Sequence, residues 1–327
     1  MRWTSGAGCA ARAAGKAEAE AEYAAYQTVL LTLTADVART YFAIGALDGE
    51  IDALTQAVEL RQKAVDMLNL RFEQGMNSEL TFYQAQTQLA QAEADLADAR
   101  RRRENLINAL AVLCGQSASD FELPHTPLKI PVPPVPAGIP SEILKRRPDI
   151  IEAERLLAAA NERVGIAQAS FFPSVTLTGS YGTSSMSADN LFEWSSRQWS
   201  LGPSVSMPIF KGGRLKAETE ARQAEYTGAL EEYRKRVLTA FGEVENALAD
   251  IRLRQEQSAA QQKLLKAARQ ATNISIQRYK EGLVNFLEVI DTERSRLQAE
   301  RDAIEIQSEE LIAVVHLIKA TGSTWKN

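Results

Sequence analysis

The chain has 327 residues, of which 45% are hydrophobic and 24% charged, enough to bury a core in one or two domains. Its formal net charge is −5 and its pI about 5.4. This balance disfavours nucleic-acid binding, because neutralising phosphates requires a basic surface. The cysteines and histidines, Cys9, Cys114, His125 and His316, lie far apart in the sequence, so zinc-ligand spacing and a disulfide framework are both absent. No metal site, no cofactor and no enzymatic activity are expected.

The first residues are not expected to form a signal peptide, because residues 1–8 are too short for its apolar core. Ala7-Gly8-Cys9 is similar to the end of a lipoprotein cleavage site, which makes Cys9 a candidate lipidation site. The alternative is a chance cysteine in an Ala/Gly-rich segment. No stretch is expected to approach the roughly 18 apolar residues of a membrane-spanning helix. Contact with a membrane would then need a barrel or a surface association.

An internal repeat organises the chain. Shifting the sequence by 207 residues, without gaps, aligns Arg71 with Arg278 and Gly75 with Gly282. The period is too long for a solenoid, so it indicates a duplicated half-molecule. It predicts two helical hairpin repeats, 10–115 and 211–322.

In the first repeat, apolar residues recur at alternating steps of three and four, the pattern of a coiled-coil seam. They are Phe82, Ala85, Leu89, Ala92, Leu96, Ala99, Leu106, Leu110 and Leu113. The alanines let neighbouring helices approach closely, as a packed helical wall requires. A coiled-coil rod without a pore is the alternative.

Residues 116–147 are predicted to form a Pro-rich extended connector with a short equatorial helix, which Ser141 can cap. The segment 148–171 is predicted to be a helix that leads to a membrane segment. Pro148 can open this helix, with Asp149 at its positive end.

Residues 172–210 are predicted to form a transmembrane β-hairpin, because apolar and small polar residues alternate along two strands. The apolar residues are expected to share one face and to remain exposed, since lipid would cover them: Val175, Leu177, Tyr181, Trp199, Leu201, Val205 and Met207. The alternative is a half-buried hairpin of a soluble sheet.

The second repeat begins with residues 214–280, which contain no proline and only the glycines Gly228 and Gly242. These 67 residues predict a helix of roughly 100 Å. Gly282 should end it, and a second helix should follow from about Asn285 to Lys319. Hairpin tips are therefore expected at 73–78 and 280–285.

Several stretches resemble one known family. They are Pro140-Ser141-Glu142-Ile143-Leu144-Lys145-Arg146-Arg147-Pro148-Asp149-Ile150, Ala153-Glu154, Phe171-Phe172-Pro173-Ser174, the Arg-Phe/Tyr-x-x-Gly turns at 71–75 and 278–282, and Gly212-Gly213-Arg214-Leu215. Together they resemble the TolC-like outer membrane factors, in particular the NodT-type outer-membrane lipoproteins of RND efflux pumps. The likeness covers the chain after about residue 13.

The resemblance implies a mainly α fold, in which very long antiparallel helical hairpins form an α-barrel tunnel. A membrane β-hairpin would contribute to a trimeric β-barrel. The implied function is the outer-membrane channel of a tripartite efflux pump in a Gram-negative bacterium, a passive duct exporting drugs, dyes, metals or solvents. Implied partners are two further copies, a periplasmic adaptor (membrane fusion protein), an inner-membrane pump and outer-membrane lipid. A type I secretion duct is an alternative.

The resemblance also implies a periplasmic gate on the helix after Gly282. It assigns an apolar constriction to Leu287, an acidic ring to Asp291 and an ionic tether to Arg294, and Glu288 matches a position that is acidic in some members. From spacing alone, Glu288, Asp291 and Arg294 lie on one helix face. A solvated charged face is the alternative.

The hairpin tips and the adaptor contact are assigned to Arg71, Gly75, Arg278 and Gly282. The sequence departs from the family pattern before the first long helix, where a full member has an earlier helix and a strand hairpin. Three copies would then supply six strands, whose open edges lipid cannot satisfy. An N-terminal truncation is therefore expected.

Overall fold

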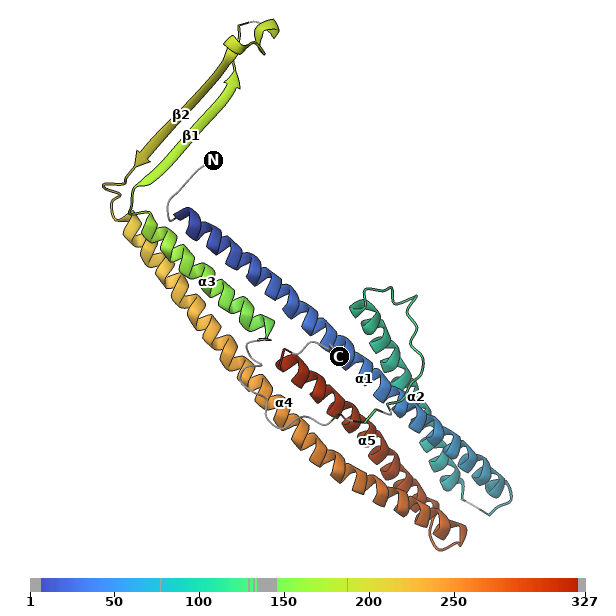
Figure 1. Cartoon of the computed structure of the whole chain (residues 1–327). Helices are drawn as coiled ribbons and strands as arrows, with labels where there is room; N and C mark the ends of the chain where they lie inside the picture. Colours follow the sequence, from blue (N-terminus) through green and yellow to red (C-terminus); the bar gives the residue numbers. More distant parts are fainter. Residues whose placement is uncertain are drawn as a thin grey trace. The chain divides into compact units, whose positions relative to one another are not determined.

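The computed structural model describes residues 7–76, 78–128, 130–131, 133, 146–186 and 188–322. Helices and two strands make up nearly all of the described chain (Figure 1). The long helices are α1 (Ala7–Glu73), α2 (Glu79–Leu113), α3 (Pro148–Ala169), α4 (Arg214–Lys280) and α5 (Phe286–Ala320), and the strands are β1 (Ser174–Thr183) and β2 (Arg197–Ser206). Between the strands lie two short 3-10 helices, Ala188–Asn190 and Trp194–Ser196.

The predicted helices are confirmed almost to the residue. The unbroken helix expected over 214–280 is α4, and the helix expected from Asn285 to Lys319 is α5, shifted by one residue. The equatorial helix capped by Ser141 falls outside the described residues. The domain limits drawn from the sequence remain predictions.

The chain divides into two compact units, with the divisions inside α1 and α4. The first unit contains Met1–Val29 and Ser141–Phe241, which hold the start of α1, α3, both strands and the start of α4. The second contains Leu30–Pro140 and Gly242–Asn327, which hold the rest of α1, α2, the rest of α4 and α5.

In the first unit, small residues pack α3 against its neighbours. Ala159 on α3 and Ala21 on α1 are almost fully buried. Arg155 and Arg163 of α3 form ion pairs with Glu20 and Glu18 of α1, respectively. Alanines let helices approach closely, and the charged side chains border the contact.

The N-terminus of α3 is fixed by a bidentate ion pair. Arg147 donates from Nε and Nη2 to the two carboxylate oxygens of Asp149, at 3.0 and 2.7 Å. Burial by itself raises the pKa of Asp149, but the hydrogen bonds and charge of Arg147 outweigh it and hold the pKa below its ordinary value. Asp149 therefore remains an anion at the positive end of the helix.

The strands β1 and β2 form the predicted antiparallel hairpin. Val175 pairs with Val205 and Tyr181 with Trp199, so these four side chains share one face. One part of the prediction is wrong: β2 ends at Ser206, and 207–209 continue without strand pairing. Pro208 lacks an N–H for the ladder, and the pairing stops at Ser174 and Ser206. Met207 thus lies beyond the hairpin.

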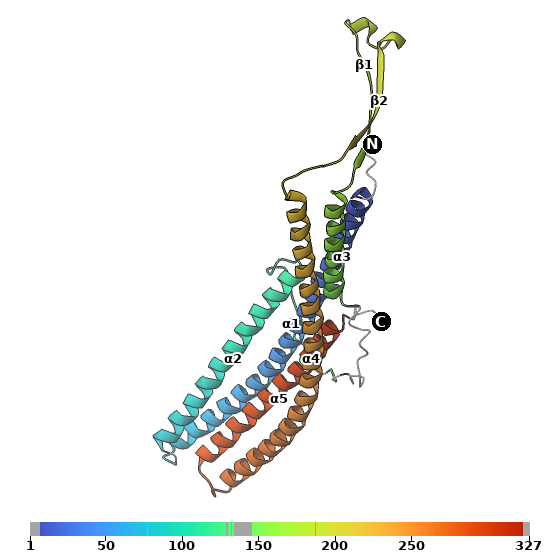
Figure 2. The ribbon, with the colours of Figure 1, turned by 90° about the vertical axis from the view of Figure 1, so that its left-hand side faces the viewer.

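In the second unit, α1 with α2 and α4 with α5 form two antiparallel hairpins that lie side by side, with both tips at the same end (Figure 2). Their seams bury Leu54, Leu68 and Ala99 completely. Leu297 of α5 joins the cluster around Leu54 and Ala99, so the two hairpins share a core. The predicted seam packing is confirmed.

The expectation that no segment approaches a membrane-spanning helix in apolarity is wrong for α1. Within Gly8–Glu73 one 18-residue window reaches a mean hydropathy of 1.2 with at most two charged residues. The cause is the stretch from Thr28 to Leu47, whose only charges are Asp36 and Arg39. The helix α1 meets this criterion by its length and composition only, and 17% of the window is buried within the chain.

Candidate functional site

The two hairpin tips have the same backbone conformation. Gly75 and Gly282 adopt φ of 70° and 74°, a region that glycine enters without the steric cost that a Cβ brings. Around Gly75, the N–H of Met76 donates to Arg71 O at 2.8 Å, and the N–H of Gly75 donates to Phe72 O at 2.8 Å. This pair of bonds is a Schellman motif, which satisfies the last carbonyls of the helix.

The second tip repeats the motif, with Leu283 N donating to Arg278 O and Gly282 N to Tyr279 O. Asn285 then caps α5 by accepting a hydrogen bond from Glu288 N at 3.2 Å, as Ser78 caps α2. The predicted tips at 73–78 and 280–285 are confirmed, since the helices end at Glu73 and Lys280.

The two arginines predicted at the tips contact different partners. Arg71 crosses from the first hairpin to the second, where its Nη1 donates to the Tyr279 hydroxyl at 3.4 Å and its guanidinium lies 5.9 Å from the ring centroid. Arg278 stays within its own hairpin and pairs with Glu288 at 3.5 Å. Both partners of that pair are about half exposed, so the pair contributes roughly 0–1 kcal/mol.

The predicted gate residues lie on the exposed surface of α5. Arg294 Nη2 is 4.0 Å from Asp291 Oδ1, and both side chains are 71% exposed. Leu287 is exposed as well. Glu288 faces Arg278 of α4, so its carboxylate already has a cationic partner. Within one chain, this group has neither the burial nor the contacts of a closed site.

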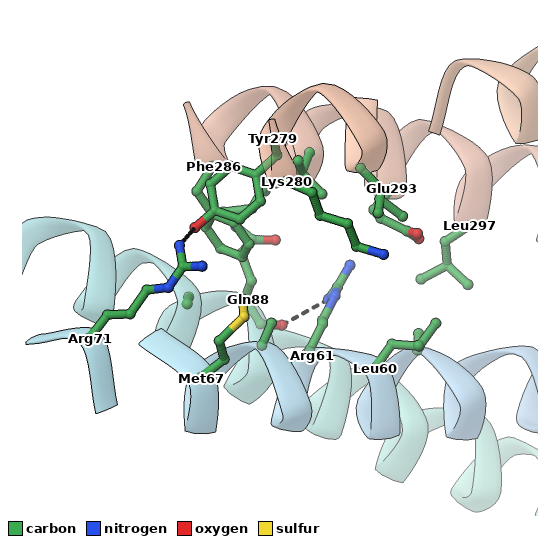
Figure 3. Close-up of a pocket in the computed structure, with 16 residues that line it drawn as sticks. Leu60, Arg61, Met67, Arg71, Gln88, Tyr279, Lys280, Phe286, Glu293 and Leu297 are labelled. Carbon is green, nitrogen blue, oxygen red and sulfur yellow. Dashed lines mark hydrogen bonds between the residues drawn. The ribbon is translucent and has the colours of Figure 1, made fainter. Parts of the chain in front are cut away.

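A cavity of about 230 Å³ lies between the two hairpins near their tips, and sequence reasoning did not find it (Figure 3). Apolar side chains line most of it, including Leu60, Met67, Phe286, Val289 and Leu297. Arg61, Arg71, Lys280 and Glu293 provide its charges. The cavity exists only because α1 and α2 meet α4 and α5, and no spacing within one helix reveals that contact.

A buried polar cluster was also missed. Asp48 on α1 is 1% exposed and accepts hydrogen bonds from Arg103 of α2 and, at 2.7 Å, from Thr126 N. His125 Nδ1 lies 3.0 Å from the Asp48 carboxylate, and its Nε2 lies 2.8 Å from Asp52 Oδ1. The cluster fastens the segment after α2 onto α1.

Among the described residues, no group of three or more His, Cys, Asp or Glu side chains could hold a metal ion. Cys9, the candidate lipidation site, lies in the first turns of α1 and is exposed.

Two long helical hairpins built on one repeat, linked through an antiparallel strand pair, define a mainly α class of fold. The chain matches the family described as "Outer membrane efflux protein" over residues 4–116 and 139–323. It therefore belongs to the outer membrane efflux protein family. Membership confirms the predicted resemblance and the predicted outer-membrane location.

Individual relatives agree with this assignment. The chain is 32% identical over 297 residues to outer membrane protein OprJ of Pseudomonas aeruginosa. It is 35% identical over 304 residues to solvent efflux pump outer membrane protein SrpC of Pseudomonas putida. These alignments cover 90% and 92% of the chain, but 62% and 64% of the relatives. A crystal structure of a membrane protein from P. aeruginosa superposes with a TM-score of 0.91 at 30% identity, covering 99% of this chain and 74% of that one.

Proposed function

We propose that the chain is the outer-membrane component of a tripartite efflux pump and acts as a passive duct for small molecules. It works as a homotrimer in which copies of β1 and β2 form part of a membrane barrel and the long helices line a periplasmic tunnel. The single observation that carries this proposal is the strand hairpin. Its two faces differ in a way that suits lipid on one side and water on the other.

One face of the hairpin is apolar, although no residue that the structure describes covers the large apolar side chains on it. Tyr181, Trp199, Leu201 and Val205 are each more than 60% exposed. The opposite face carries small polar residues, and Ser180 there hydrogen-bonds Ser200 across the strands at 2.8 Å. A soluble hairpin would bury its apolar face, whereas a membrane barrel turns that face to lipid.

The relatives supply the class of transport. SrpC is named for a solvent efflux pump, so we assign small apolar or amphipathic cargo to this chain, delivered by an inner-membrane pump through a periplasmic adaptor. The exposed apolar strand hairpin argues against a coiled-coil rod, because a rod made only of helices would not contain one. A polypeptide secretion duct has the same architecture, and the family match to efflux proteins favours small molecules.

We place the periplasmic gate at Leu287, Asp291 and Arg294, and the adaptor contact at the tips around Gly75 and Gly282. The Asp291–Arg294 pair is too exposed to matter within one chain. Around a three-fold axis, three copies of each residue would converge in a narrow lumen. Arg294 would then compensate the mutual repulsion of the aspartates, in its own copy or in a neighbouring one.

Replacing Asp291 and Arg294 together by alanine is expected to raise the ion conductance of the protein in planar bilayers without reducing assembly. The ion pairs that hold the tip closed would be gone, and the increase over wild type should be largest at low salt, where screening is weak. The matched control removes Glu231 and Arg234, an exposed pair at the same i,i+3 spacing on α4. An assembled Asp291/Arg294 variant whose conductance equals that of wild type at low and high salt would contradict the gate assignment.

A further inference from the structure

We propose that the cavity between the two helical hairpins binds a small amphipathic organic anion, an aromatic or aliphatic carboxylate or sulfonate. The cavity lies within one chain, and its lining comes from α1, α2, α4 and α5 of the same copy. The class of ligand follows from the apolar wall and from the charges that surround it.

The apolar wall is suited to a hydrocarbon body. Met67 and Leu60 of α1 face Phe286 and Leu297 of α5 across the cavity (Figure 3). The volume of about 230 Å³ is slightly smaller than a typical drug-sized pocket, which favours a compact ligand such as one or two fused rings. Burying such a body gains roughly 25 cal/mol for each Å² removed from water.

The charges at the cavity are unbalanced. Lys280 and Arg71 have no carboxylate within 4.0 Å among the described residues, and Arg71 has only the neutral Tyr279 hydroxyl as a polar partner. Glu293, the acidic residue in the lining, already binds Arg296 at 3.0 Å. Three cations therefore surround a cavity whose one carboxylate is engaged.

Arg61 adds a second, independent indication. Its Nη1 donates to the backbone oxygen of Gln88 at 2.8 Å, which holds the guanidinium against the wall. Partial burial, together with the nearby charge of Arg296, lowers the pKa of Arg61 despite the attraction of Glu293 and Asp95, so these carboxylates do not fully offset the loss of solvation. An anion in the cavity would supply that compensation.

The side chains already point toward a common place. Figure 3 shows Arg61 extending from the first hairpin and Lys280 from the second, with their charged ends directed toward one another. Two cations that approach from opposite sides repel each other unless an anion lies between them. A sulfonate or carboxylate there would accept charge-assisted hydrogen bonds from both hairpins, while its apolar body fills the space beneath.

The test uses the purified protein in nanodiscs and naphthalene-2-sulfonate as the probe, followed by isothermal titration calorimetry with empty nanodiscs as the blank. We expect one site per chain, and binding at least tenfold tighter than that of uncharged naphthalene-2-sulfonamide. Arg61→Gln and Lys280→Gln should each weaken binding about tenfold, equivalent to about 1.4 kcal/mol. The exposed Lys266 of α4 provides the matched control, and Lys266→Gln should leave binding unchanged.

Two further variants separate loss of the site from loss of the fold. Lys280→Arg keeps the charge and should retain binding, whereas Ala64→Leu fills the cavity without changing any charge and should abolish it. Equal affinity for the sulfonate and the sulfonamide would overturn the proposal, as would undiminished sulfonate binding in folded Arg61→Gln and Lys280→Gln variants. Absence of any binding at millimolar probe would overturn it as well.

Discussion

Leu201→Arg is expected to prevent most of the protein from assembling in the outer membrane, whereas Ser204→Arg is expected to be tolerated. Leu201 lies in the middle of β2 and is 63% exposed on the apolar face, opposite Gly179. An arginine facing lipid at mid-membrane depth costs about 2–4 kcal/mol in each copy. That is roughly a 30- to 1000-fold shift in the folding equilibrium.

Ser204 is the control because it belongs to the same strand but to the opposite face, where it pairs with Thr176. An arginine there would extend into water in the barrel interior. The measurement is the fraction of folded, trimeric protein in isolated outer membranes, read from its resistance to denaturation by detergent without heating. Equal loss for both variants would mean that the two faces of the hairpin have the same environment, contrary to the membrane interpretation.

Asp48→Ala is expected to destabilise the second unit by roughly 3–5 kcal/mol, the cost of leaving a buried charge without its partner. Asp48 is almost fully buried and receives Arg103, Thr126 N and His125. Its removal leaves the 14%-exposed Arg103 side chain without that carboxylate, although Arg103 still donates to Leu123 O. Amide hydrogen exchange should therefore accelerate most in α1 around Ile44 and in 121–128.

Asp52→Ala is the matched control, since Asp52 lies one helical turn further along α1 and shares the same histidine. Its side chain is 51% exposed, and its pairing with His125 is a surface contact worth under about 1 kcal/mol. Exchange in 121–128 should change little. If the two variants accelerate exchange equally, the buried carboxylate has no special role in holding the connector.

The long helices could be predicted because their signals are local. The absence of proline from 214–280 indicated that α4 is unbroken, and the glycine at its tip indicated where it ends. Because the sequence repeats, the same hairpin could be predicted for the first half of the chain. The apolar face shared by the two strands followed from two-residue alternation, whereas their register did not. The failure at Met207 has a local cause as well, since the proline at 208 ends the ladder and the alternation of apolar residues continues past it.

The cavity and the buried cluster could not be predicted, because they depend on contacts between residues far apart in the sequence. Asp48 and Asp52 are both helix carboxylates in similar sequence surroundings, yet one is buried and the other half exposed. Only the packing of α2 and the return of 121–128 onto α1 separates them. Likewise, Arg61 and Lys280 come together only when the two hairpins pack.

The central claim is that one face of the β1–β2 hairpin contacts lipid and the other contacts water. It can be tested directly by spin labelling. Cys9 and Cys114 are free and exposed, so both would be replaced by serine before single cysteines are introduced between Trp199 and Val205. In protein reconstituted into vesicles, labels at 199, 201 and 205 should collide with oxygen dissolved in lipid, and labels at 200 and 204 with a water-soluble nickel chelate. Uniform accessibility to the nickel chelate along the strand would contradict the account.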